Sequence, residues 1–80
     1  MTKTRKYEEK ITVDKPGFYK ISHNLKGYPI VDIRDKNGKP YLEIAEDNEP
    51  CAIPIDFDDE NTLYLRFRVG GFSGTVYCFV

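Results

Sequence analysis

Residues 63–69 read Leu-Tyr-Leu-Arg-Phe-Arg-Val, and this stretch has the most regular alternation in the chain. An apolar side chain stands at every second position, with Tyr or Arg between. A period of two is typical of a β-strand that buries one face and exposes the other. The stretch therefore predicts a central strand. Its inward side chains are Leu63, Leu65, Phe67 and Val69, and its outward side chains are Tyr64, Arg66 and Arg68.

Shorter alternating segments surround this strand, and clusters of Gly, Pro, Asn and Asp separate them. The expected strands are 7–13, 18–22, 30–34, 39–44, 53–57 and 75–80. No segment sustains the apolar spacing of a helix, and residues 45–48 are the one place where a single helical turn fits. About seven short strands joined by tight turns predict an all-β fold, a small antiparallel β-sandwich or barrel.

The turn signals indicate how these strands connect. Pro16-Gly17 suits a type II turn, which predicts a first hairpin between 7–13 and 18–22. Asn37-Gly38 is the strongest hairpin dipeptide, so we expect 39–44 to pair back onto 30–35. Further turns are expected at 58–61, at Gly70-Gly71 and at Ser73-Gly74.

The 80 residues predict a single domain, 1–80, in which residues 1–6 form a flexible N-terminal extension. A domain of this size has a thin core, and such domains often gain stability from a partner subunit. The 6 Tyr and 5 Phe could fill the core or cover a contact surface. A homo-oligomer is therefore expected.

Charge and cysteine content narrow the possible partners. The net charge of -1 provides no field that would attract nucleic acid or a membrane surface, and no apolar run approaches the ~20 residues that span a bilayer. Cys51 and Cys78 are expected to be free thiols, with a disulfide as the alternative. One His and no CxxC motif leave no zinc set, so we expect neither a metal nor a cofactor.

Nothing in the sequence predicts an enzyme. Ser73 lies in Gly-Phe-Ser-Gly, which lacks the spacing of a nucleophile elbow. Any catalytic triad would need His23, the one histidine, which we interpret as a structural residue at the start of loop 24–29. The carboxylates of residues 56–60 are ordinary for a solvated turn, although their oxygen density is also what calcium prefers.

The candidate binding residues are aromatic and arginine side chains on the outward face of the 63–69 strand. Tyr64, Arg66 and Arg68 would form a row, with Tyr77 or Phe79 across from them, and Tyr28 is exposed in a loop. Such side chains can anchor a protein interface, stack sugars or stack bases. The alternative is a structural role, in which Arg stems cover neighbouring rings.

Residues 21–80 resemble a β-sandwich module of bacteriophage tail fibres and related virion proteins. The motifs that carry the resemblance occur in the same order. They are His23-Asn24-Leu25, Tyr28-Pro29, Val31-Asp32-Ile33, Asp35-Lys36-Asn37-Gly38, Asp59-Glu60-Asn61-Thr62-Leu63 and Phe72-Ser73-Gly74-Thr75. Residues 39–57 depart from the pattern in two extra prolines and Cys51.

The resemblance implies a non-enzymatic phage or prophage structural module that is made in the host cytoplasm and resides in the virion. Its partners would be copies of itself and other virion proteins. The structural loop residues would be His23, Asn24, Pro29, Asn37, Gly38, Ser73 and Gly74. An alternative is a small carbohydrate-binding module, in which Tyr28, Tyr64 and Tyr77 stack a surface glycan. A single-strand nucleic-acid binder using Arg66 and Arg68 is a third possibility, which the charge disfavours.

Overall fold

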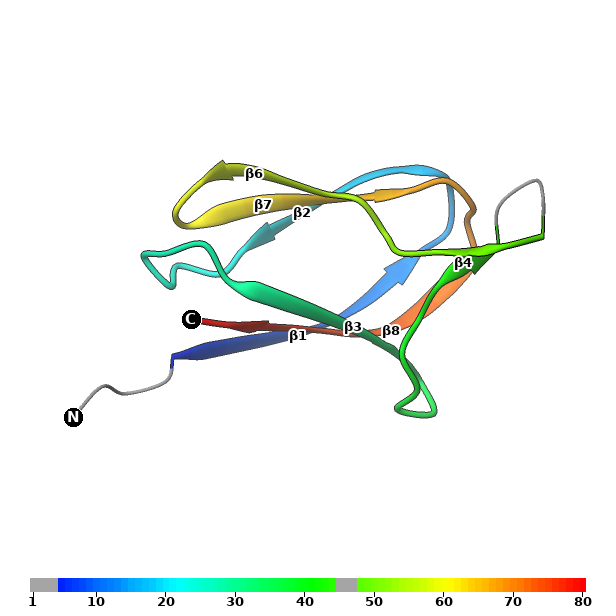
Figure 1. Ribbon diagram of the computed structural model, residues 1–80, viewed down its shortest axis with the longest axis horizontal. Helices are drawn as coiled ribbons and strands as arrows, with labels where there is room; N and C mark the ends of the chain where they lie inside the picture. The colour runs from blue at the N-terminus through cyan, green and yellow to red at the C-terminus, as the bar shows by residue number, and fades with distance from the viewer. Residues whose placement is uncertain (1–4, 45–47) are drawn as a thin grey trace.

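A computed structural model describes residues 5–44 and 48–80 as two antiparallel sheets packed face to face (Figure 1). The described residues contain eight strands and no helix. The strands are β1 (Lys6–Val13), β2 (Gly17–Ser22), β3 (Ile30–Asp35), β4 (Glu43–Ile44), β5 (Pro50–Cys51), β6 (Ile55–Asp59), β7 (Thr62–Phe67) and β8 (Phe72–Phe79). The predicted all-β class is confirmed, in the form of a sandwich.

The first sheet has the order β1-β8-β3, and the second has the order β2-β7-β6. A two-stranded ribbon of β4 and β5 lies at one end of the sandwich (Figure 1). The described residues include no helix that is long and apolar enough to cross a membrane.

Strand β7 is the central strand of its sheet, as its alternation predicts. Leu63, Leu65 and Phe67 are buried, with at most 1% of their surface exposed. The expectation that Val69 also faces inward is wrong, because β7 ends at Phe67 and Val69 is 51% exposed. Residues 68–71 leave the second sheet there to enter β8 of the first sheet.

The predicted first hairpin does not form. β1 pairs with β8, whereas β2 pairs with β7, so residues 14–16 cross from one sheet to the other. Gly17 has a φ of 147°, far from the value near +80° that a type II turn needs. β1 therefore joins the first sheet and β2 the second, and each strand contributes apolar side chains to the core between the sheets.

The two sheet crossings lie against each other at Gly70. A Cβ atom at Gly70 would lie 2.2 Å from the backbone oxygen of Asp14, so only glycine fits there. The backbone N–H of Gly71 also donates to the oxygen of Val13 at 2.7 Å. This contact joins the two crossings at one end of the sandwich.

The Asn37-Gly38 turn forms, but the strand pairing beyond it is short. The Gly38 N–H donates to the Asp35 oxygen, and a single bridge joins Arg34 to Pro40. Pro40 lacks an N–H and cannot continue the ladder. The expected pairing of 39–44 with β3 is therefore wrong beyond Tyr41, whose N–H still donates to Ile33. The chain then runs into β4, which pairs with β5.

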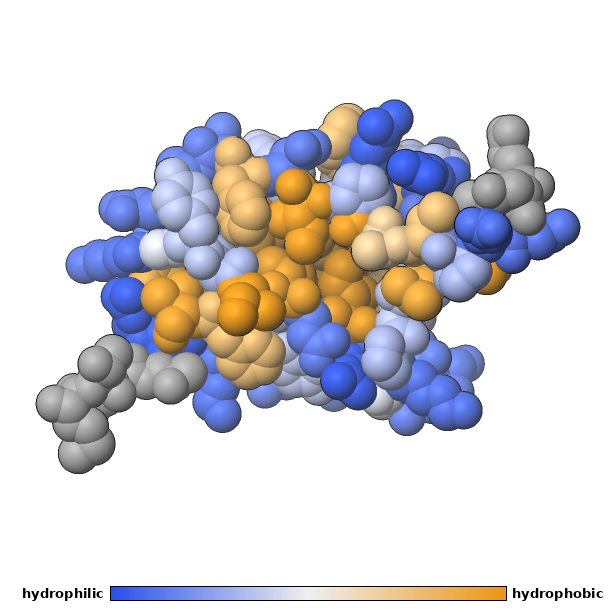
Figure 2. Space-filling model, viewed as in Figure 1, coloured by the Kyte–Doolittle hydropathy of each residue, from blue (hydrophilic) through white to orange (hydrophobic). Residues whose placement is uncertain are grey.

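Strands β6 and β7 form a hairpin around residues 60–61, within the turn predicted from composition. The core lies between the two sheets and consists of Ile11, Val13, Ile21, Leu25, Ile33, Ile53, Leu63, Leu65, Phe67, Phe72, Val76 and Cys78. Figure 2 shows apolar side chains between the sheets on the side where β3 and β6 lie.

The N-terminal end of the described chain is paired with the C-terminus. The Arg5 N–H donates to the Val80 oxygen at 3.0 Å, the Val80 N–H donates back at 2.8 Å, and Lys6 pairs with Phe79. The expected extension therefore ends before Arg5, and its residues 1–4 lie outside the described residues. The helical turn expected at 45–48 lies outside them as well, at residues 45–47.

Candidate functional site

His23 is buried, with 3% of its surface exposed, and it organises the loop between β2 and β3. Its Nδ1 accepts a hydrogen bond from the Leu25 N–H at 3.0 Å, and its Nε2 has no partner among the described residues. Burial lowers the pKa of the imidazole, against the opposing effect of Asp59. The ring is therefore neutral near pH 7 and has no access to a substrate.

The rest of this loop binds the β6–β7 turn through Asn61. The Asn61 backbone oxygen accepts hydrogen bonds from the N–H groups of His23 and Asn24, and its side-chain oxygen accepts one from Lys26. Asn24 has a φ of 55°, in the left-handed region that Asn tolerates. Pro29 is buried where the loop enters β3. These contacts hold residues 23–29 against the β6–β7 turn at the point where the chain enters β3.

Asn37 and Gly38 form the turn after β3, and an aspartate holds it. The side-chain oxygen of Asp35 accepts hydrogen bonds from the N–H groups of Asn37 at 2.9 Å and Lys39 at 3.0 Å. Gly38 has a φ of 80°, which favours glycine.

Ser73 and Gly74 do not form a turn, contrary to the sequence prediction. Both lie within β8, where Ser73 pairs with Thr12, and Gly74 pairs with Ile11 and with Asp35. A Cβ at Gly74 would lie 2.1 Å from the Arg34 oxygen. Gly74 is thus required by the close approach of β3, a long-range contact that resembles a turn signal in sequence.

The predicted row of binding residues is divided between the two sheets. Tyr64 and Arg66 lie on the outer face of the second sheet, and Arg68 follows the end of β7. Tyr77 and Phe79 lie on the first sheet, so they are not across from this row. The prediction fails because it assumed that β7 and β8 pair directly.

On the outer face of the second sheet, Tyr64 lies between Lys20 and Asp56 in the strand register. The guanidinium of Arg66 lies 6.0 Å from the ring centre of Phe18, which is 64% exposed. This contact is the cross-strand cover that the structural alternative described.

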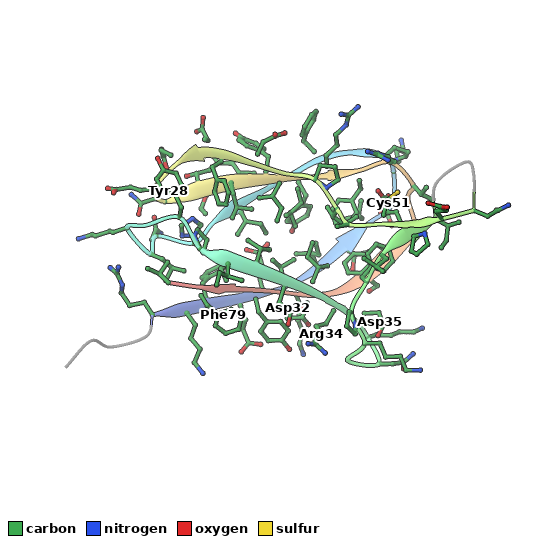
Figure 3. The ribbon with its side chains drawn as sticks, in the orientation of Figure 1. Tyr28, Asp32, Arg34, Asp35, Cys51 and Phe79 are labelled. Atoms are coloured by element: carbon green, nitrogen blue, oxygen red, sulfur yellow. The ribbon has the colours of Figure 1, made fainter. Side chains whose placement is uncertain are left out.

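Tyr28 lies at a third place, beside β6 (Figure 3). Its ring is 67% exposed and meets Phe57 edge to face, with ring centres 5.4 Å apart. Because Tyr28, Tyr64 and Tyr77 lie on different surfaces, they do not form one flat platform for a sugar.

Glu43 is 3% exposed, and no sequence pattern predicts its role. Its Oε2 accepts hydrogen bonds from the N–H groups of Arg68 at 2.8 Å and Val69 at 2.9 Å, whereas Oε1 has no partner among the described residues. Glu43 thereby binds the backbone of the β7–β8 crossing. A lone Glu in a short strand carries no local signal of such a contact.

Glu9 lies on the same face of β1 as the buried Ile11 and Val13, and there it accepts hydrogen bonds from the hydroxyls of Tyr7 and Tyr19. The bond from Tyr7 to Glu9, together with burial, raises the pKa of Tyr7 to about 12. Burial likewise raises the pKa of the Cys78 thiol to about 11. Cys51 and Cys78 are both free in the structure.

The outer face of the first sheet carries charged, aromatic and apolar side chains in regular rows, and we call it the β8 face. Figure 3 shows Asp32, Arg34 and Phe79 on this outer side. The register pairs define three rows across the strands. They are Lys6, Phe79 and Ile30; Glu8, Tyr77 and Asp32; and Lys10, Thr75 and Arg34.

Two shallow grooves lie on the β8 face. One, of about 350 Å³, is lined by Lys6, Tyr7, Glu8, Tyr77 and Phe79. The other, of about 470 Å³, lies toward the opposite end of the strands, and its lining includes Lys10, Arg34 and Thr75 together with the smaller residues Thr12, Ser73 and Gly74. Among the described residues, no group of three or more His, Cys, Asp or Glu side chains is placed so that it could hold a metal ion.

No protein-family model, curated protein or solved structure matches this chain.

Proposed function

We propose that this protein is a non-enzymatic interaction module that assembles with copies of itself through the β8 face. The supporting observation is the apolar end of that face. Ile30 is 77% exposed there, and the half-buried rings of Tyr77 and Phe79 lie beside it. Exposed apolar groups rimmed by charged residues mark protein interaction surfaces.

The remaining chemistry agrees with a binding role. The single His is buried and neutral, the Cys78 thiol is buried with a raised pKa, and Glu43 is occupied by backbone donors. None of these groups combines access to solvent with a polar partner that would activate it.

The side of the sandwich formed by β3 and β6 is less suited to strand-to-strand assembly. Its edge strand β6 follows Pro54 and carries Asp56, Asp58 and Asp59. Proline and repeated charge on an edge strand oppose pairing with another chain. We therefore place the interface on a sheet face rather than on this edge.

The setting of the proposal is a phage or prophage virion, in which the module would contact its own copies and other virion proteins. This setting rests on the resemblance of residues 21–80 to tail-fibre modules. The carbohydrate alternative finds less support, because the three candidate tyrosines lie on separate surfaces.

Light scattering over a concentration series tests this proposal. We expect the mass to rise from one chain toward a fixed multiple, and Ile30→Asp to return the protein to one chain because it places a charge in the apolar contact. Phe18→Asp is the matched control, since Phe18 is 64% exposed on an edge strand of the other sheet. A wild-type protein that stays at the mass of one chain throughout would refute self-assembly.

A further inference from the structure

Two neighbouring rows of the β8 face carry opposite charges. The acidic row consists of Glu8, Tyr77 and Asp32, and the basic row consists of Lys10, Thr75 and Arg34. The rows are two residues apart along the strands, which is about 7 Å. In each row the two charged side chains flank an uncharged residue of β8.

Glu8 and Lys10 are exposed, and the side chain of neither forms a hydrogen bond or ion pair with another described residue. Asp32 and Arg34 form an ion pair within β3, at 2.9 Å between Oδ2 and Nε. The β1 side of the face therefore has one free carboxylate and one free ammonium group, available to bind outside the chain.

We propose that the β8 face packs against the same face of a second copy, around a two-fold axis that crosses the strands between the acidic and basic rows. This inference rests on the proposed function and names its partner and register. The rotation places the acidic row of each copy opposite the basic row of the other. Glu8 then faces Lys10 of the second copy, Asp32 faces Arg34, and Tyr77 faces Thr75.

The shape of the face fits the same rotation. The large side chains of Ile30 and Phe79 lie beyond the acidic row, whereas the groove that Thr12 and Ser73 help to line extends from the basic row toward the other end of the strands. The axis places the large side chains of each copy over the groove of the other. An interface on a two-fold axis must be complementary to itself in this way.

The outer face of the second sheet is not complementary to itself under the same rotation. Its row of Lys20, Tyr64 and Asp56 mixes charges, and the next row contains Phe18 and Arg66. The same operation would place Lys20 opposite Phe18 and Tyr64 opposite Arg66, with no charge matched. Of the two outer faces, the β8 face is therefore the one whose charges match a second copy under this rotation.

The expected contributions differ between the two kinds of contact. Exposed ion pairs set register and specificity more than affinity, so the apolar side chains supply most of the binding. Like charges placed opposite each other are unfavourable. The net charge of -1 leaves little general repulsion between copies.

Charge reversal at the free pair tests the inference. We expect Glu8→Lys or Lys10→Glu alone to raise the dissociation constant of the dimer at least about tenfold. Each variant places like charges of the two copies opposite each other across the two-fold axis. The double variant, with both changes, should return to within about threefold of wild type, since opposite signs again face each other. Lys20→Glu, on the other sheet, is the matched control and should have no effect.

The dissociation constants are measured by sedimentation, with circular dichroism and thermal melts to show that each variant is folded. Single variants that associate as well as wild type would refute the matching of acidic and basic rows across the axis, whereas Ile30→Asp tests assembly through the β8 face independently of those charges. Weakened single variants that the double variant does not restore would refute the two-fold register. A wild-type protein that never associates would refute both this inference and the proposed function.

Discussion

At the scale of single residues, two carboxylates act as hydrogen-bond acceptors inside the fold, Glu9 for nearby residues and Glu43 for residues far along the chain. Glu43 binds the N–H groups of Arg68 and Val69, and Glu9 binds the hydroxyls of Tyr7 and Tyr19. Alternation in β1 predicts the inward position of Glu9, because period-two patterning needs only local sequence. The position of Glu43 could not be predicted, since its partners lie in a crossing whose path depends on the whole fold.

Removal of the Glu43 carboxylate should destabilise the protein markedly. We expect Glu43→Ala to lower the free energy of unfolding by about 2–5 kcal/mol, because it leaves two backbone N–H groups without an acceptor. Glu60→Ala, in an exposed turn, should change it by less than about 0.5 kcal/mol. Urea denaturation measures both values, and a Glu43→Ala protein as stable as the control would show that these hydrogen bonds contribute little.

Tyr7 should lose its hydroxyl proton at a higher pH than a free tyrosine, and this ionisation should destabilise the folded state. Its pKa in the folded protein is about 12, against 10.0 for a free tyrosine, so the folded state holds the proton more tightly. By linkage, this stabilisation is complete below pH 10.0 and is lost as the pH rises toward about 12. Tyrosinate absorbance follows the titration.

The variant Glu9→Gln should bring the pKa of Tyr7 back toward its ordinary value, because it removes the carboxylate that accepts the hydrogen bond from the Tyr7 hydroxyl. Glu8→Gln, exposed on the opposite face of β1, is the control and should leave the titration unchanged. A late titration that survives in Glu9→Gln would contradict the role of Glu9.

At the scale of elements, the sequence predicts where the strands lie better than how they pair. Hydrophobic alternation is local, so it located β1, β3 and β7 closely. Pairing depends on which sheet each strand joins, and a Pro-Gly signal is compatible both with a hairpin and with a crossing between sheets. The same ambiguity placed Ser73 and Gly74 in a turn rather than inside β8.

Gly74 offers a direct test of the observed pairing. Gly74→Ala should lower the free energy of unfolding by at least about 3 kcal/mol, because the added Cβ meets the Arg34 backbone within a sheet. Gly38→Ala meets no atom within 4 Å and should lower it by only about 1 kcal/mol, the strain of a positive φ. Equal losses in denaturant titrations would contradict the close approach of β3 and β8.

At the scale of the whole molecule, the predicted all-β class is confirmed. The candidate interaction surface is now the β8 face instead of the outward face of the 63–69 strand. Aromatic and arginine content indicated binding residues, but it could not show that Tyr64 and Tyr77 face opposite ways. That separation follows from β7 and β8 belonging to different sheets. The rows of the β8 face likewise became visible only once the register of β1, β8 and β3 was known.

The central claim is that the β8 faces of two copies meet with Glu8 opposite Lys10. Sedimentation of Glu8→Lys mixed with Lys10→Glu in equal amounts tests it most directly, because positions 8 and 10 are both Lys in one variant and both Glu in the other. Each variant alone should dimerise at least about tenfold more weakly than wild type, and the mixture should form one-to-one dimers about as tightly as wild type does. A mixture that associates no more than its separate components would contradict the claim.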